Sequence, residues 1–296
     1  MNRIIATFAV TLCLSCRLAQ AAAPTATERC EAPALTEAES MHLQQQSEDR
    51  LGTIPKVRAS ALLALAADRI ARSQDDGKAC RKALERGEKT FQKALRKKTR
   101  SVRGNAGKAE STDPSILAVQ ESLRAAFIAD QAARLAYLDL ATDDRKGADF
   151  WAQRLATANA IELDGAHTQL LRDLLEDYDW IDSHRFGPRI ASHAWVLAQH
   201  ADADPAFQQL ALERMRPYLD NGGVRPGDYA YLFDRVAVNQ GRPQRYGTQP
   251  MGECNADGSL SPKPLEDPES VDARRAELGL GPMADAMGDM ASRRCR

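Results

Sequence analysis

Apolar and polar residues recur with a helical period over most of the chain. Between residues 116 and 140, apolar side chains return every three or four positions, which is typical of a long amphipathic helix. Aromatic residues make up only 5% of the chain, so leucine, alanine, valine and isoleucine must supply most of the core. The chain is therefore predicted to be mainly α, a multi-helix bundle preceded by an N-terminal helical segment. The same pattern predicts further helices over 36–50, 59–72, 78–100, 147–160, 167–177, 188–201, 205–218, 226–240 and 268–278.

Local signals refine this pattern at two places. Asp164 is the predicted N-cap of the helix over 167–177, because an aspartate side chain accepts hydrogen bonds from the first helical turn. Residues 244–249 and 260–265 have strand character on either side of an Asn-Ala-Asp-Gly turn, and the prolines of the second stretch place it at an edge. They predict one small β-hairpin late in the chain.

The first 21 residues have the features of a signal peptide. Arg3 precedes a short apolar stretch over residues 4–16, and a small-x-small site ends at Ala21, where cleavage is expected. The alternative is a lipoprotein anchored at Cys16, although the residues before Cys16 fit a lipobox poorly. The protein is therefore expected to be exported, periplasmic or secreted, with no transmembrane segment in the mature chain.

Cleavage leaves four cysteines, an even number that predicts two disulfides in an exported chain. We favour Cys30–Cys80 and Cys254–Cys295, which keep each bridge within its own segment of the chain. The alternative is free, buried thiols. The four cysteines lack the close spacing of tetrahedral zinc sites, so neither a metal nor another cofactor is expected.

Charge is distributed unevenly along the chain. Residues 78–108 contain twelve basic and two acidic side chains, a net charge of +10, whereas the whole chain sums to −1 and the remainder therefore to −11. This basic block suggests contact with an anionic partner in the cell envelope, such as lipid headgroups; a nucleic acid is not expected for an exported protein. The alternative is a solvated helix face. A linker at 104–112 divides a basic helical segment, 22–108, from a mainly helical domain, 109–296.

Six polar motifs follow one another over the second half of the chain. They are D-Q-x-x-R from Asp130, Q-H-A-D over 199–202, F-Q over 207–208, Y-L-x-D-R over 231–235, Y-G-T-Q over 246–249 and V-D-x-R-R over 271–275. In this order the chain, from about residue 120 to 285, resembles a widespread bacterial family of unknown function. Residues 179–181 are Asp-Trp-Ile where the family often has Gly-Trp-Pro, so that turn is expected to differ. The resemblance implies a shared fold but no particular reaction.

Among the histidines, His200 is the candidate for catalysis. The chain contains neither an H-E-x-x-H zinc helix nor a G-x-S-x-G nucleophile motif. His200 could act as a general acid or base oriented by a carboxylate. The structural alternative is an interaction with a helix C-terminus, or with Asp202 or Asp204. His193 lies about 10 Å from His200 along the predicted helix, too far for both to chelate one metal.

Acidic residues and arginines occur together in several of these motifs. Aspartate and arginine are rarely buried unless paired, so the motifs predict a partly buried polar network. The network could be architectural, or it could line a pocket in which arginines bind an anion bidentately. The ligand-binding candidates are Asp130, Arg134, His200, Asp202, Asp234, Arg235, Tyr246, Gln249, Asp272 and Arg275.

Three functions are compatible with these features. The basic segment and the lack of a catalytic signature favour a binding or interaction module of the cell envelope. The first alternative is a hydrolase-like enzyme that uses His200 with a carboxylate and an arginine clamp. The second is a structural scaffold in which the polar motifs only hold the fold.

Overall fold

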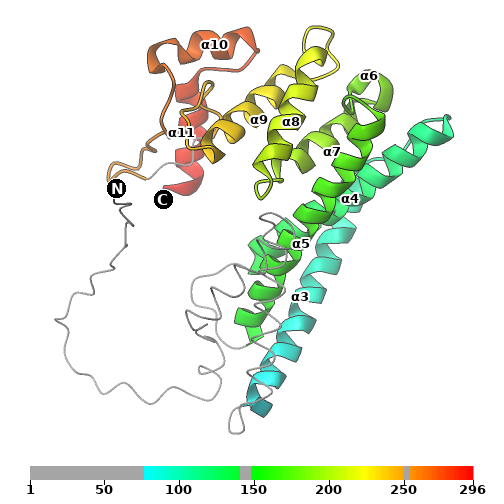
Figure 1. Cartoon of the computed structure of the whole chain (residues 1–296). Coiled ribbons are helices and arrows are strands. Elements are labelled where there is room, and N and C mark those ends of the chain that lie inside the picture. The colour runs from blue at the N-terminus through cyan, green and yellow to red at the C-terminus, as the bar shows by residue number, and fades with distance from the viewer. Residues whose placement is uncertain (1–76, 141–147, 250–253, 296) are drawn as a thin grey trace, which may run out of the picture.

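The computed structural model describes residues 77–140, 148–249 and 254–295 (Figure 1). The predicted signal peptide, the predicted helices over 36–50 and 59–72, and Cys30 lie outside the described residues. The division of the chain near residue 108 also stays a prediction.

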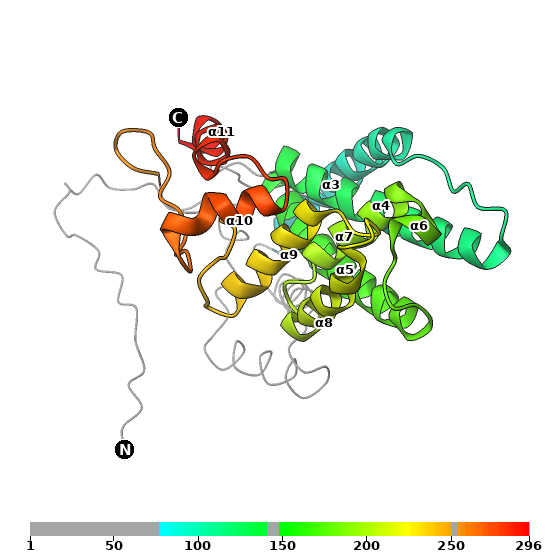
Figure 2. The ribbon, with the colours of Figure 1, turned by 90° about the horizontal axis from the view of Figure 1, so that it is seen from above.

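Three long helices, α3, α4 and α5, pack against one another and form the elongated part of the molecule (Figures 1 and 2). Phe91 of α3 packs against Leu140 and Ala152, and Val102 of α3 packs against Ala132. Small alanine side chains at these contacts let the helices approach closely. The helices span Gly77–Asn105 (α3), Pro114–Leu140 (α4) and Ala148–Asp177 (α5).

A second group of shorter helices packs on α4 and α5. Their shared core contains the fully buried side chains of Phe186, Leu197, Phe207 and Leu232, and Leu123 of α4 joins it. Prolines stand in the first turn of α7, α8 and α9, where no backbone N–H is needed. These elements are α6 (Ser183–Phe186), α7 (Pro188–Gln199), α8 (Pro205–Met215), the 3-10 turn η2 (Arg216–Tyr218) and α9 (Pro226–Asn239).

The C-terminal elements lie at the α9 end of the molecule (Figures 1 and 2). Cys254 and Cys295 form a disulfide that links the segment after α9 to the end of α11. This confirms one of the two predicted bridges; the other involves Cys30 and is not tested. The elements are η3 (Pro268–Ser270), α10 (Val271–Glu277) and α11 (Met283–Arg294). In the described part of the chain, no helix is both long and apolar enough to cross a membrane.

The mainly α fold class is confirmed, but the predicted β-hairpin is wrong. The described residues contain two isolated bridges and no strand. Gln244 pairs with Leu265 in the parallel sense, and Cys254 pairs with Leu260 in the antiparallel sense. Prolines at positions 262 and 264 remove backbone donors from the second stretch, so a continuous ladder cannot form.

Two helix boundaries also differ from the sequence pattern. The predicted break between residues 160 and 167 is wrong, because α5 runs through it and Asp164 lies inside the helix rather than at its N-cap. A further helix, α11, follows Pro282, beyond the last helix that the pattern predicted, 268–278. Gly281 and Pro282 thus lie between α10 and α11 and do not mark the end of the helical region.

Candidate functional site

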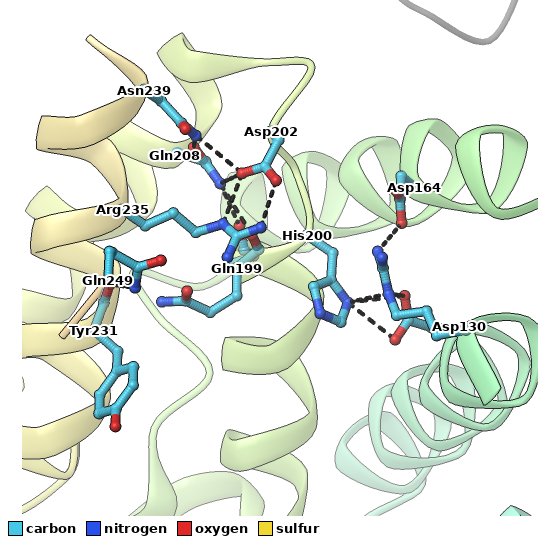
Figure 3. A network of polar contacts seen from close by, with 12 residues as sticks. Asp130, Asp164, Gln199, His200, Asp202, Gln208, Tyr231, Arg235, Asn239 and Gln249 are labelled. Atoms are coloured by element: carbon cyan, nitrogen blue, oxygen red, sulfur yellow. Dashed lines mark hydrogen bonds and ion pairs between the residues drawn. The ribbon is translucent and has the colours of Figure 1, made fainter. Parts of the chain in front are cut away.

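His200 lies at the C-terminal end of α7 and contacts a carboxylate of α4. The His200 imidazole Nδ1 is 2.9 Å and 3.0 Å from the two carboxylate oxygens of Asp130. Asp130 is only 1% exposed, whereas the His200 side chain is 19% exposed. The pair, drawn in Figure 3, therefore has a buried carboxylate end and a partly exposed histidine end. The sequence-based alternative, in which His200 pairs with Asp202 or Asp204, is wrong.

The contacts of His200 Nδ1 favour one assignment of its ring hydrogens. Its Nδ1 also lies 2.9 Å from Nε of Arg134, and one nitrogen cannot donate to Asp130 and accept from Arg134 at the same time. Arg134 Nε has a second acceptor, Asp130 Oδ1, at 3.1 Å. Because a buried, ionised carboxylate requires donors, Nδ1–H is assigned as the donor to Asp130, which leaves Nε2 available for proton transfer.

A second carboxylate joins the cluster from α5. The terminal guanidinium nitrogen of Arg134 donates to Asp164 Oδ1 at 2.6 Å, while Nε faces Asp130 on the other side. Gln131 donates to the second oxygen of Asp130 at 2.7 Å. One arginine thus bridges two carboxylates from different helices, and the cluster consists of Asp130, Arg134, Asp164 and His200. We call it the His200 cluster.

The two carboxylates have opposite pKa shifts. Burial alone would raise the pKa of Asp130, but the hydrogen bond and charge of His200, helped by Arg134 and Gln131, lower it below its ordinary value. Burial raises the pKa of Asp164 to about 6, and the nearby charge of Asp130 adds to the rise although Arg134 opposes it. Asp130 is therefore ionised near neutrality, whereas Asp164 can hold a proton in mildly acidic solution.

Two other histidines lie near this region and differ in role. His167 follows Asp164 by one turn of α5 and is buried; its Nδ1 has no hydrogen-bond partner among the described residues. Burial lowers the pKa of His167, so its ring is neutral. His193 stacks on Phe127 with the ring centroids 3.9 Å apart, and burial lowers the pKa of His193 to about 4. His193 is therefore a core residue.

The same cluster has the donor atoms of a metal site. One atom each from Asp130, Asp164 and His200 lies within 4.8 Å of the others. Two oxygens and one nitrogen suit several divalent cations. The Arg134 guanidinium, however, already donates to both carboxylates and supplies the positive charge that a cation would bring. This arrangement favours acid–base chemistry over metal binding.

Asp202 belongs to a neighbouring network that ties α7 to α9 (Figure 3). Its carboxylate accepts two hydrogen bonds from the fork of Arg235, with Nε at 2.7 Å, and another from Asn239 at 2.9 Å. The fully buried Gln208 donates to it at 3.1 Å. Burial would raise the pKa of Asp202, but these donors, led by Arg235, lower it. Because Asp202 occupies its fork, Arg235 is not a free anion clamp.

Asp234 holds the Y-G-T-Q segment against α9. Its fully buried carboxylate accepts backbone N–H bonds from Arg245, Tyr246 and Thr248 at 2.7 to 3.0 Å, and a hydroxyl bond from Thr248 at 2.9 Å. Gln249 donates to the carbonyl of Tyr231 at 3.2 Å. The predicted strand positions of Tyr246 and Gln249 are therefore wrong: the segment is a loop folded around one carboxylate.

The last motif joins the C-terminal helices to the same loop. Asp272 accepts a backbone bond from Met283 at 2.7 Å. Arg275 is buried and donates to the carbonyls of Gly281 at 2.6 Å and Tyr246 at 2.7 Å. These side chains satisfy backbone groups, which supports the architectural alternative for Asp234, Asp272 and Arg275.

Asp164 is the site residue that the sequence pattern missed. The resemblance motifs do not include it, and an Asp-Gly pair is a common helix start or turn. Its role follows from a tertiary contact with Arg134, 30 residues away. One signal in the sequence could have identified it. Asp164 lies between apolar positions, and if the helix continues there, an acidic side chain at that place needs a basic or hydrogen-bonding partner.

Comparison with known protein families identifies the region that contains the His200 cluster. The family DUF6624, described as a family of unknown function, matches residues 117–291, which is more than half of the chain. The chain belongs to the DUF6624 family. This confirms the resemblance predicted from the six motifs. No curated protein and no solved structure matches the chain.

Within the DUF6624 domain, the six motifs supply three groups of contacts. D-Q-x-x-R and the histidine of Q-H-A-D build the His200 cluster. The aspartate of Q-H-A-D, with F-Q and Y-L-x-D-R, ties α7, α8 and α9 together. Y-G-T-Q and V-D-x-R-R fasten the C-terminal segment. The first group leaves titratable side chains partly exposed, so it is where chemistry is expected.

Proposed function

We propose that the DUF6624 domain is a hydrolase-like enzyme that uses the His200 cluster for general acid–base catalysis. One observation carries the proposal: two carboxylates on either side of Arg134 have pKa values shifted in opposite directions, and the ionised one orients His200. Environments that separate the pKa values of neighbouring groups are typical of acid–base sites.

Each group has a distinct role in this proposal. His200 Nε2 takes a proton from a water molecule while the oxygen of that water attacks the electrophilic centre of the substrate. Asp130 stabilises the imidazolium that forms. The bond to the leaving group breaks, and Asp164 gives its proton to that group. His200 then returns a proton to Asp164 through solvent, which restores both groups.

Exposure agrees with these roles. The side chains of His200 and Asp164 are 19% and 22% exposed, so a small substrate can reach both. Asp130 is 1% exposed, which suits a group that orients the histidine without touching the substrate. Arg134, at 33% exposed, bridges the two carboxylates and is partly accessible to a bound anion.

The experiment is a hydrolysis assay with p-nitrophenyl acetate, phosphate and glycosides as probes. His200→Ala should lower turnover of any accepted probe by about a hundredfold or more, the usual contribution of a general base. His184→Ala is the matched control, because His184 is an exposed histidine that bonds only a carbonyl of the turn at Asn221. Equal activity in the wild type and His200→Ala would contradict the proposal.

Asp164 provides a second readout. Activity that requires its proton should fall as the pH rises above about 6, the pKa of Asp164. Asp164→Asn should lower the rate at pH 5 and leave a profile without that decline. An unchanged profile in Asp164→Asn would remove Asp164 from the mechanism while leaving the test of His200 intact.

A binding module of the cell envelope is the second candidate, and it draws on a different observation, the basic face of α3. Export to the periplasm or beyond belongs to this proposal; the Cys254–Cys295 disulfide is compatible with an oxidising compartment. The scaffold alternative would gain support if no probe were turned over and the variants lost only stability.

A further inference from the structure

Helix α3 has two faces of opposite character. Ala83, Phe91 and Val102 are buried on one face, where α3 packs against α4 and α5. On the opposite face, basic residues follow one another at alternating spacings of four and three, the spacing that keeps side chains on one side of a helix. The members of this basic stripe are Lys82, Arg86, Lys89, Lys93, Arg96, Arg100 and Arg103, and all of them are exposed.

The geometry of an α-helix fixes the shape of this stripe. At 3.6 residues per turn, the seven side chains fall within an arc of about 100°, and at 1.5 Å per residue they extend over about 32 Å. Glu85 lies at the edge of the arc and Glu88 lies outside it. The stripe is therefore a straight, nearly uninterrupted row of positive charge.

Partners for these charges are missing within the described part of the chain. Lys98 lies on the packed side of α3 and pairs with Asp139 at 2.7 Å. No side chain of the stripe forms an ion pair or hydrogen bond with a described residue. A helix that needed only solubility would mix both signs on its outer face. The uniform sign suits an anionic partner.

We propose that the basic stripe of α3 binds the surface of an anionic phospholipid bilayer, with the helix lying parallel to the membrane. Because α3 packs against α4 and α5, only its basic face is open to a partner, and a straight face of this kind suits a planar surface. The single aromatic residue of α3, Phe91, is buried, so no ring is available to stack on bases. The stripe contains no apolar side chain that could insert into the acyl region, so adsorption is electrostatic.

The charge of the rest of the chain favours an orientation in which α3 faces the membrane. Outside residues 78–108 the chain carries a net charge of −11. An anionic surface attracts the stripe and repels the remainder, which holds the protein with α3 toward the membrane. The inference is independent of the proposed hydrolase activity, because the stripe contains none of the residues of the His200 cluster.

The experiment is co-sedimentation of the purified protein, expressed from the full-length sequence, with vesicles. Vesicles of phosphatidylcholine alone are compared with vesicles that contain about 30% phosphatidylglycerol, in low salt and in about 0.5 M salt. Binding is expected only to the anionic vesicles and only in low salt. Binding to neutral vesicles, or binding that high salt leaves unchanged, would overturn the proposal.

Matched variants locate the contact. The triple variant Lys89→Gln, Lys93→Gln and Arg100→Gln should weaken vesicle binding by more than about tenfold, because each charge near the surface contributes separately. The control variant Arg189→Gln, Arg225→Gln and Arg242→Gln removes the same charge from exposed positions elsewhere and should bind as the wild type does. Equal losses in both variants, or tighter binding of the wild type to duplex DNA than to vesicles at one salt concentration, would reject the stripe as a lipid site. Melting curves of both variants check that the fold is kept.

Discussion

Asp130 and His200 are 70 residues apart in the chain, and their side chains meet at 2.9 Å. The contact joins α4 to the end of α7 and places an ionised carboxylate behind the imidazole. It also makes the pair part of the fold, since Asp130 is nearly inaccessible to solvent. Stability and proposed chemistry therefore depend on the same hydrogen bond and must be measured separately.

Asp130→Asn should reduce both the stability of the fold and the proposed activity. The amide keeps the volume but removes the charge that Arg134 and His200 meet, so the free energy of unfolding should fall by about 3 kcal/mol. Urea titration measures the loss. Glu121→Gln, a change at an exposed site on the same helix, is the control and should alter stability by less than about 0.5 kcal/mol. Equal values for the two variants would mean that the buried contact contributes nothing.

Asp164 should make stability depend on pH. Its pKa in the folded protein, about 6, lies above the ordinary 3.8, so folding favours its neutral form. This contribution is complete below pH 3.8 and is lost as the pH rises through 6. Asp164→Asn cannot ionise, so its stability relative to the wild type should increase between pH 4 and pH 7, by at most about 3 kcal/mol. Unfolding curves at both pH values check this, and a constant difference would contradict the pKa shift.

Asp234→Ala should destabilise the protein strongly. Three backbone N–H groups and one hydroxyl would lose their common acceptor inside the core. Burial of unsatisfied donors predicts a loss of about 3 kcal/mol or more. Asp257→Ala is the comparison, because Asp257 accepts a backbone bond from Ser259 in an exposed turn and should cost less than about 1 kcal/mol. Similar costs at the two positions would show that the loop does not depend on Asp234.

Gly247→Ala tests the close contact in the Y-G-T-Q loop. Gly247 has φ +62°, and an added Cβ would lie 2.8 Å from Sδ of Met283. Gly222 has φ +77° with open space around it, so Gly222→Ala carries the backbone strain alone. We expect Gly222→Ala to cost about 1 kcal/mol and Gly247→Ala to cost more. Thermal unfolding of the two variants side by side gives the difference, and an equal or smaller loss at Gly247 would mean that Met283 moves away freely.

Reduction of the Cys254–Cys295 disulfide should loosen the C-terminal segment. The two cysteines are separated by 41 residues, and a cross-link of that length contributes about 4 kcal/mol in the chain-entropy model. Cys295→Ser should lower the urea midpoint in the absence of reductant, and in reductant it should match the wild type. A peptide map without reductant identifies the bridge directly and also tests the predicted Cys30–Cys80 pair. Recovery of Cys254 as a free thiol would refute the disulfide.

The sequence predicts the helices best where apolar periodicity is uninterrupted. The expected helix over 116–140 corresponds to α4, which begins two residues earlier at Pro114. The pattern failed at Asp164, where a local capping signal was outweighed by the contact with Arg134. It failed again at residues 244–249, because alternation suggested a strand while the carboxylate of Asp234 gathers the backbone donors into a loop.

The candidate site was predicted in part. Sequence motifs identified Asp130, Arg134 and His200, which the structure brings together, but they also included Asp234, Asp272 and Arg275, which bond backbone groups. A motif records that a polar residue is needed and does not say whether its partner is a substrate or a carbonyl. Only the three-dimensional arrangement separates the two cases.

The turn between α7 and α8 has a consequence for motion within the DUF6624 domain. His200 is fastened to α4 and Asp202 to α9, with a single residue between them. A span of one residue cannot lengthen. A shift of α9 against the long helices must therefore displace the imidazole, or break the contact of His200 with Asp130 or that of Asp202 with Arg235. The turn therefore couples the position of the imidazole to that of α9, and one inserted residue would change the spacing between the two attachments.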